Sequence, residues 1–87
     1  MKFRAYFEIA GRPDVEETPV YLEAENRDKA KEKISNTLTE KFDCTDEEIQ
    51  LFNLVSEFEN PEGVRDRVCG WEAGKPIAWD KNPLIID

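Results

Sequence analysis

The sequence predicts a small α+β domain, in which an antiparallel sheet of four to five strands packs on one main helix in the order ββαβββ. Two patterns carry this prediction. Apolar and polar residues alternate over residues 2–10, as in a half-buried strand, and apolar residues recur every fourth position over residues 27–42, as in a helix with one buried stripe. The length of 87 residues suits one core, so residues 1–87 are expected to form a single domain.

The first predicted strand covers residues 2–10. Its apolar face comprises Phe3, Ala5, Phe7 and Ile9. Its other face, expected to meet solvent, comprises Lys2, Arg4, Tyr6 and Glu8. Turn residues at 11–14 lead to a second alternating segment, 19–24, with Tyr21 pointing outward, and the two segments are expected to pair as a hairpin. Pro19 lacks an N–H for the ladder, so it marks a strand start or an edge position.

The main helix is predicted over residues 27–42 and is expected to pack on the hairpin. Asn26 is a favourable N-cap residue, because its side-chain oxygen can accept a hydrogen bond from the first turn. One stripe is apolar and comprises Ala30, Ile34, Leu38 and Phe42. Burial of its large side chains would contribute about 1.5–3 kcal/mol each.

Residues 45–59 fit two templates. Thr45 to Glu48 has the capping-box pattern, and apolar residues at 51, 54, 55 and 58 have helical spacing, which together favour a short second helix near 45–58. Against this, residues 49–58 are rich in β-forming residues, and a two-stranded hairpin under one helix needs more sheet. We favour a strand over 49–58 after one helical turn, with the helix as the alternative.

The last third of the chain is predicted to add sheet. Residues 60–63 read as a turn, and two short strands, 64–71 and 76–79, flank a hairpin loop at 72–75. The tail, residues 82–87, ends in apolar residues and is expected to dock on the domain.

The charge of the chain is strongly negative, with a formal net value of −8. Its acids are concentrated, because residues 14–25 hold five acids and no base, and residues 42–62 hold seven acids and no base. If the strand of the first segment lies beside the strand of the second, the two segments make one acidic face.

Several classes of chemistry are disfavoured. The chain has no histidine, which removes the commonest general base and the nucleophilic triads. Cys44 lies among acids that would raise its thiol pKa, and Cys44 and Cys69 lack the spacing of a zinc site or a disulfide framework. We therefore expect no catalytic residue, no metal site and no cofactor. The absence of a long apolar run favours a cytoplasmic protein without a membrane contact.

The acidic segments remain the distinctive feature, and they favour a non-catalytic protein–protein interaction module. Carboxylates on one surface would meet a basic partner, as an inhibitor or a mimic of nucleic-acid phosphates does. The predicted partner-binding residues are Glu16, Glu17, Asp46, Glu47, Glu48, Glu57, Glu59 and Trp79. Trp71 and Trp79 could form an exposed aromatic platform or close the core.

Three alternatives stay open. An exposed edge strand together with a tryptophan would build a homodimeric accessory protein. A direct nucleic-acid-binding module is disfavoured by the net charge of −8, since phosphate contacts dominate such binding. Carboxylate-based catalysis would need a cleft, which a chain of 87 residues has little mass to build.

A resemblance to known proteins rests on one junction of the chain. Here a strand over residues 20–26 ends at an N-cap residue and leads into the helix that starts at Arg27. Together with the strand at 2–10 and the small size, this junction resembles accessory proteins carried by phages and plasmids, among them anti-CRISPR inhibitors and DpnD/PcfM-like proteins. The resemblance covers residues 2–42 and implies an accessory or inhibitory role, without assigning any residue a function.

Overall fold

The computed structural model describes residues 1–65, 70–72, 75–77 and 82–87 and confirms the α+β class. Its strands and helices, in chain order, are β1 (Lys2–Ile9), β2 (Thr18–Glu23), α1 (Arg27–Phe42), β3 (Ile49–Ser56), α2 (Pro61–Arg65), β4 (Gly70–Glu72), β5 (Lys75–Ile77) and β6 (Leu84–Ile85). Two short 3-10 helices, η1 (Pro13–Val15) and η2 (Asp46–Glu48), precede β2 and β3. Trp79 and Cys69 lie outside the described residues.

The main sheet has four strands in the order β3-β1-β2-β6. β1 pairs antiparallel with both β2 and β3, which confirms the predicted hairpin and adds the third strand on its other side. β6 runs parallel to β2, so the prediction of a purely antiparallel sheet is wrong at this edge. The tail docks as expected, but it runs in the same direction as β2, and Ile86 N donates to Tyr21 O at 2.9 Å.

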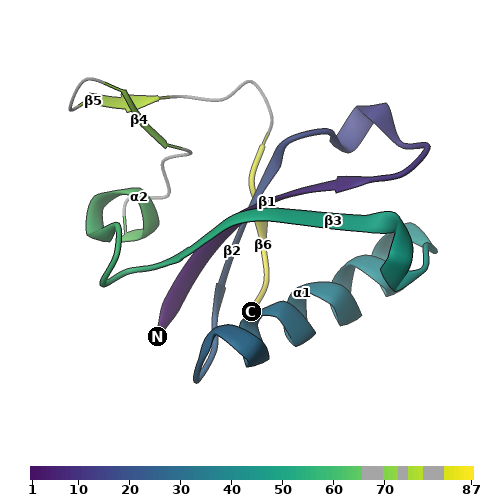
Figure 1. The fold of residues 1–87 in the computed structure, drawn as a ribbon, viewed down its shortest axis with the longest axis horizontal. Helices are drawn as coiled ribbons and strands as arrows, with labels where there is room; N and C mark the ends of the chain where they lie inside the picture. The colour runs from purple at the N-terminus through teal and green to yellow at the C-terminus, as the bar shows by residue number, and fades with distance from the viewer. Residues whose placement is uncertain (66–69, 73–74, 78–81) are drawn as a thin grey trace.

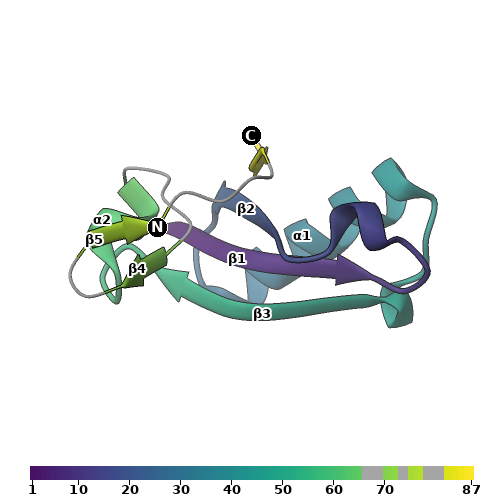
Figure 2. The ribbon, with the colours of Figure 1, turned by 90° about the horizontal axis from the view of Figure 1, so that it is seen from above.

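The core lies between this sheet and α1, which covers one face of the strands (Figures 1 and 2). Ala30, Ile34 and Leu38 of the predicted stripe are fully buried, and Phe42 packs at the margin of the core. The ring of Phe42 lies 6.0 Å from that of Phe7, centroid to centroid. The predicted N-cap is also confirmed, because Lys29 N donates to the Asn26 side chain at 2.9 Å.

The ambiguous stretch at 45–59 is a strand that follows one turn of 3-10 helix, as favoured from the sequence. β3 ends at Ser56, so Phe58 lies beyond it with 77% of its surface exposed. The strand is interrupted at Asn53, whose φ is 55°, and the pairing register with β1 shifts between Arg4 and Tyr6. This irregularity is a β-bulge, which bends the strand and ends its regular ladder.

The C-terminal third differs most from the prediction. The residues expected to form a turn at 60–63 begin the helix α2, since the Asn60 side chain accepts a hydrogen bond from Gly63 N at 3.2 Å and Pro61 takes the first helical position. Of the strand predicted over 64–71, residues 64 and 65 lie in α2 instead, residues 66–69 lie outside the described residues, and residues 70 and 71 belong to β4, which pairs with β5 in a separate two-stranded sheet. This hairpin lies on the side of the main sheet opposite α1 (Figure 1).

The second face of the sheet is not the solvent-facing surface that alternation predicted. Arg4, Tyr6 and Tyr21 each retain only 5% exposure. The Arg4 guanidinium carbon lies 4.9 Å from the centroid of the Tyr6 ring, a stacked cation–π arrangement. α2 contacts β1, and its Val64 is buried and lines the same hollow as Tyr21. The domain therefore has material on both faces of its sheet, and alternation alone cannot distinguish solvent from a second layer.

Candidate functional site

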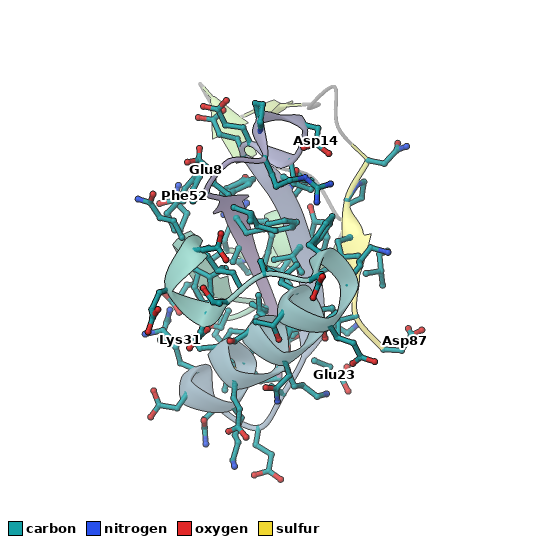
Figure 3. The ribbon with its side chains drawn as sticks, turned by 90° about the vertical axis from the view of Figure 1, so that its right-hand side faces the viewer. Glu8, Asp14, Glu23, Lys31, Phe52 and Asp87 are labelled. Atoms are coloured by element: carbon teal, nitrogen blue, oxygen red, sulfur yellow. The ribbon has the colours of Figure 1, made fainter. Side chains whose placement is uncertain are left out.

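Acidic side chains gather where the β1–β2 connection meets the start of β3. Figure 3 looks onto this end, with Glu8 and Asp14 in its upper part. Ala10 N donates to Glu48 O at 2.9 Å, which joins η2 to the end of β1. We call this region the acidic end and define it by Glu8, Asp14, Glu16, Glu17, Asp46, Glu47 and Glu48.

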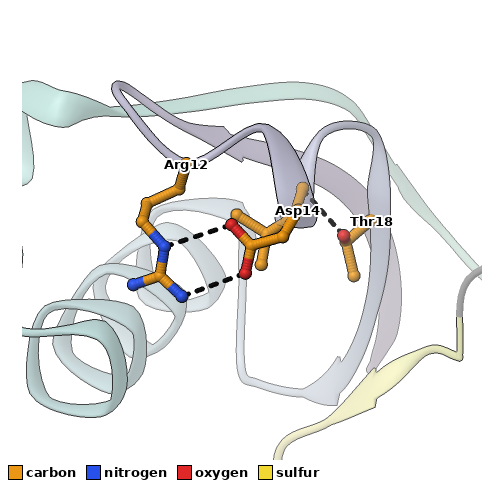
Figure 4. A network of polar contacts seen from close by, with 4 residues as sticks. Arg12, Asp14 and Thr18 are labelled. Carbon is orange, nitrogen blue, oxygen red and sulfur yellow. Dashed lines mark hydrogen bonds and ion pairs between the residues drawn. The ribbon is translucent and has the colours of Figure 1, made fainter.

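The η1 turn holds its shape through its own polar contacts (Figure 4). Arg12 donates to both oxygens of Asp14, from Nε at 3.1 Å and from Nη2 at 3.0 Å, and Thr18 Oγ1 donates to Val15 O at 2.7 Å. The hydrogen bond and the charge of Asp14 raise the pKa of Arg12. The guanidinium carbon also lies 5.3 Å from the Phe42 ring centroid, so Arg12 is held between a carboxylate and an aromatic face.

The η2 turn is held by a capping box. Thr45 N and Thr45 Oγ1 donate to the Glu48 carboxylate at 2.9 and 3.1 Å. The hydrogen bond from the Thr45 backbone is the main reason that the pKa of Glu48 is lowered from its ordinary value, and the Thr45 hydroxyl adds to it. Asp46 accepts a hydrogen bond from Ser35 Oγ of α1. Two of the three predicted η2 carboxylates therefore also fix the local structure.

Three other carboxylates at this end do not hold a turn in place. Glu8 is half-buried, and Glu17 and Glu47 are exposed. Within the described ranges, none of the three side chains forms an ion pair or a hydrogen bond. Glu8 also lines a surface hollow of about 220 Å³ with Glu16. Like charges that are left uncompensated on one surface repel one another, and a complementary partner would relieve this repulsion.

Glu57 and Glu59 do not join the acidic end. They follow the other end of β3, which is eight residues long, or about 25 Å at the usual rise of a strand. The Glu57 carboxylate accepts from Lys2 N at 3.0 Å. Glu59 accepts from Ser56 N at 3.2 Å and forms an ion pair with Arg27 of α1.

The two acidic segments also do not form one continuous face, because β1 lies between β2 and β3 in the sheet. Glu23 and Glu25 lie towards the end of β2 that is remote from the acidic end. Only the first part of each acidic segment lies at the acidic end. These parts are residues 14–17 and 43–48. Glu8 and Asp14 are the two members that the sequence prediction omitted. The signal for Glu8 was its place on the polar face next to the predicted turn, and the signal for Asp14 was its place in the first acidic segment.

Other kinds of site find little support in this geometry. Within the part of the chain that the structure describes, no three His, Cys, Asp or Glu side chains are placed to hold a metal ion. Cys44 is a free thiol whose Sγ lies 3.6 Å from Leu38 O, its hydrogen-bond acceptor. None of the described helices has the length and apolar character needed to cross a membrane. The predicted contact residue Trp79 lies outside the described residues.

Comparisons of the chain with models of protein families, with curated proteins and with solved structures found no match.

The lowered pKa values of Glu48 and Glu59 lead us to expect that the fold loses stability in acid. Both carboxylates have a pKa lowered from the ordinary 4.5, in each case chiefly by a backbone hydrogen bond. A lowered folded pKa stabilises the fold above 4.5, and this contribution is lost as the pH falls below that value. We expect the thermal midpoint to be steady near neutral pH and to decrease below a pH of about 4.5.

The matched variant is Glu48→Gln, because glutamine still fits a capping box but does not titrate. Its thermal midpoint, followed by circular dichroism, should decrease less than that of the wild type over the same acid range. An identical decrease in both proteins would contradict the role of Glu48.

Proposed function

We propose that this chain is a non-catalytic protein-binding module whose acidic end docks on a basic surface of another protein. The observation that carries the proposal is that Glu8, Glu17 and Glu47, from three separate segments, lie at the same end of the sheet, with none of their carboxylates engaged within the described residues. A net charge of −8 adds a long-range field that speeds encounter with a positively charged partner.

The partner is therefore expected to present Lys and Arg side chains on one surface. Proteins that bind nucleic acids have such surfaces, since they neutralise phosphates with the same residues. An acidic module bound there would compete with the nucleic acid, which is the inhibitory role that the resemblance to phage accessory proteins implies. Docking would take place at the acidic end, and the remaining acids would contribute only to the long-range field.

The test compares two charge-matched double variants. Glu17→Lys/Glu47→Lys reverses two unengaged carboxylates of the proposed site, and Glu23→Lys/Glu25→Lys makes the same change in net charge at the remote end of β2. All four side chains are exposed, so both variants should remain folded. The probe is a fluorescein-labelled oligolysine peptide, and its affinity is measured by anisotropy at about 0.15 M salt, where the screening length is about 8 Å.

We expect the acidic-end variant to bind at least about tenfold more weakly than the wild type, which corresponds to about 1.4 kcal/mol. The remote variant should lose less than about threefold, because at this salt concentration it acts only through a screened field. Equal losses in the two variants would show that net charge alone determines binding and would contradict a docking site at the acidic end.

A further inference from the structure

We propose that the exposed edge of β3, at residues 49–52, accepts an extended basic segment of the partner as an additional strand of the sheet. This inference rests on the proposed function and specifies the mode of docking beside the acidic end. Strand addition is an established mode of peptide recognition, in which backbone hydrogen bonds give affinity and alternate side chains give specificity.

The phase of the β1–β3 ladder determines which backbone groups face outward. Ala10 N donates to Glu48 O at 2.9 Å, so this pair is hydrogen-bonded. In an antiparallel ladder the bonded pairs recur every second residue, which places Gln50 and Phe52 in bonded positions opposite β1. Leu51, between them, directs both its N–H and its C=O away from β1. Within the described residues, no group forms a hydrogen bond to this outward side of Leu51.

The other half of this edge, residues 53–56, has its outward-facing carbonyl groups engaged or its ladder interrupted. The bulge at Asn53 interrupts the strand, and Arg27 Nη1 donates to Leu54 O just beyond it. The carbonyl of Ser56 accepts from Glu59 N at 3.1 Å and from Asn60 N at 3.0 Å. Proteins protect sheet edges with bulges and charged side chains in this manner, because an open edge pairs with other chains. At the start of the strand, Ile49 N donates to Asp46 O within the η2 turn. The stretch that stays open is therefore short, is centred on Leu51 and lies next to the acidic end.

The chemistry beside this open edge indicates the kind of segment that would bind. A hollow of about 380 Å³ lies between Ile49 and Leu51 on one side and residues 31–36 of α1 on the other. Glu32, Asp46 and Lys31 also line it. Glu32 forms an ion pair with Lys29, and Asp46 accepts a hydrogen bond from Ser35, so both carboxylates lie among polar groups of α1. A lysine or arginine of the added strand would lay its apolar stem along Leu51 and direct its charge towards these acids.

A second copy of this chain is a poorer occupant. Antiparallel pairing of two β3 edges would bring the η2 turn of one copy alongside the Ser56 end of β3 in the other. Asp46–Glu48 would then lie near Glu57 of the partner copy, and like charges placed side by side in a sheet are destabilising. Each copy also carries a net charge of −8. The proposed occupant is therefore an extended segment of another protein that carries alternate lysine or arginine residues.

The experiment uses the acetylated and amidated peptide Lys-Val-Lys-Val-Lys-Val as the probe. Two further versions carry N-methyl groups on backbone nitrogens, one version at its valines and the other at its lysines. Because alternate residues direct their N–H groups to opposite edges of an extended peptide, each version loses the N–H donors along one edge. A peptide added to β3 forms its backbone hydrogen bonds through only one of its two edges. We expect one N-methylated version to bind at least tenfold more weakly than the parent and the other to bind within threefold of it. Binding of the parent should also slow hydrogen exchange at the Leu51 amide at least tenfold.

The outcomes separate this inference from the proposed function. If both N-methylated peptides bind as tightly as the parent, and Glu17→Lys/Glu47→Lys weakens all three, strand addition is overturned and acidic docking stands. If the parent peptide binds no better than its Glu-Val counterpart, both proposals are overturned. A dimer in sedimentation at micromolar concentration, with the Leu51 amide already protected from exchange, would overturn the inference in favour of a second copy.

Discussion

Leu38→Asp is expected to unfold the domain. Leu38 lies in the centre of the α1 stripe, has no exposed surface and belongs to the core cluster between helix and sheet. The substitution removes a large apolar side chain and places a carboxylate in a cluster of buried apolar residues, and each of these changes costs several kcal/mol. A domain of this size has a free energy of unfolding of only about 5–10 kcal/mol. The variant should therefore lack a cooperative thermal transition.

The control is Asn36→Asp, which introduces the same side chain two residues earlier at an exposed position of α1. Its thermal midpoint should lie within a few degrees of that of the wild type, since exposed substitutions usually change stability by less than about 0.5 kcal/mol. Far-UV circular dichroism on heating measures both variants. A cooperative transition for Leu38→Asp at the wild-type midpoint would contradict the placement of α1 on the sheet.

Phe7→Ala should have the second-largest effect on stability. Phe7 is fully buried in the central strand β1 and packs near the Phe42 ring on the α1 side of the sheet. Truncation of a buried phenylalanine loses its transfer free energy and leaves a cavity, which together cost about 3–5 kcal/mol. Urea denaturation should show this decrease as a lower midpoint with a similar slope.

Phe58→Ala is the matched control, because the same atoms are removed from a side chain that is 77% exposed. We expect a change within about 0.5 kcal/mol. If the two alanine variants were destabilised equally, the assignment of Phe7 to the core and Phe58 to the surface would be wrong.

The elements that the sequence predicted well are those with a strong local pattern. Strict alternation identified β1 and β2, and the four-residue repeat together with Asn26 identified α1 nearly to the residue. In the stretch at 45–59, the capping box fixed η2, and the density of β-forming residues outweighed the helical spacing. In each case the local preference and the tertiary packing favour the same structure.

The elements that the sequence did not predict depend on contacts between distant segments. Burial of Arg4 and Tyr6 reflects material on the second face of the sheet, which the pattern of one strand does not encode. The parallel pairing of β6 with β2 depends on where the chain returns after its last third. α2 was missed because Asn60 and Pro61 are turn residues as often as they are helix starts.

The candidate site was predicted in part. The sequence named Glu16, Glu17 and the η2 carboxylates, and the structure places them at one end of the sheet. The sequence prediction grouped Glu57 and Glu59 with them, although the eight-residue strand β3, which ends at Ser56, places these two residues beyond its opposite end. It could not reveal the open edge at Leu51, which depends on the ladder phase and on the bulge at Asn53.

The most direct test of the central claim is an NMR titration of the isotope-labelled chain with the Lys-Val peptide. We expect the largest changes in amide chemical shift at Glu8, Glu17, Glu47 and residues 49–52, with small changes at the remote end near Glu23. Changes that centre on the remote end, or that are spread evenly over all acidic residues, would contradict docking at the acidic end.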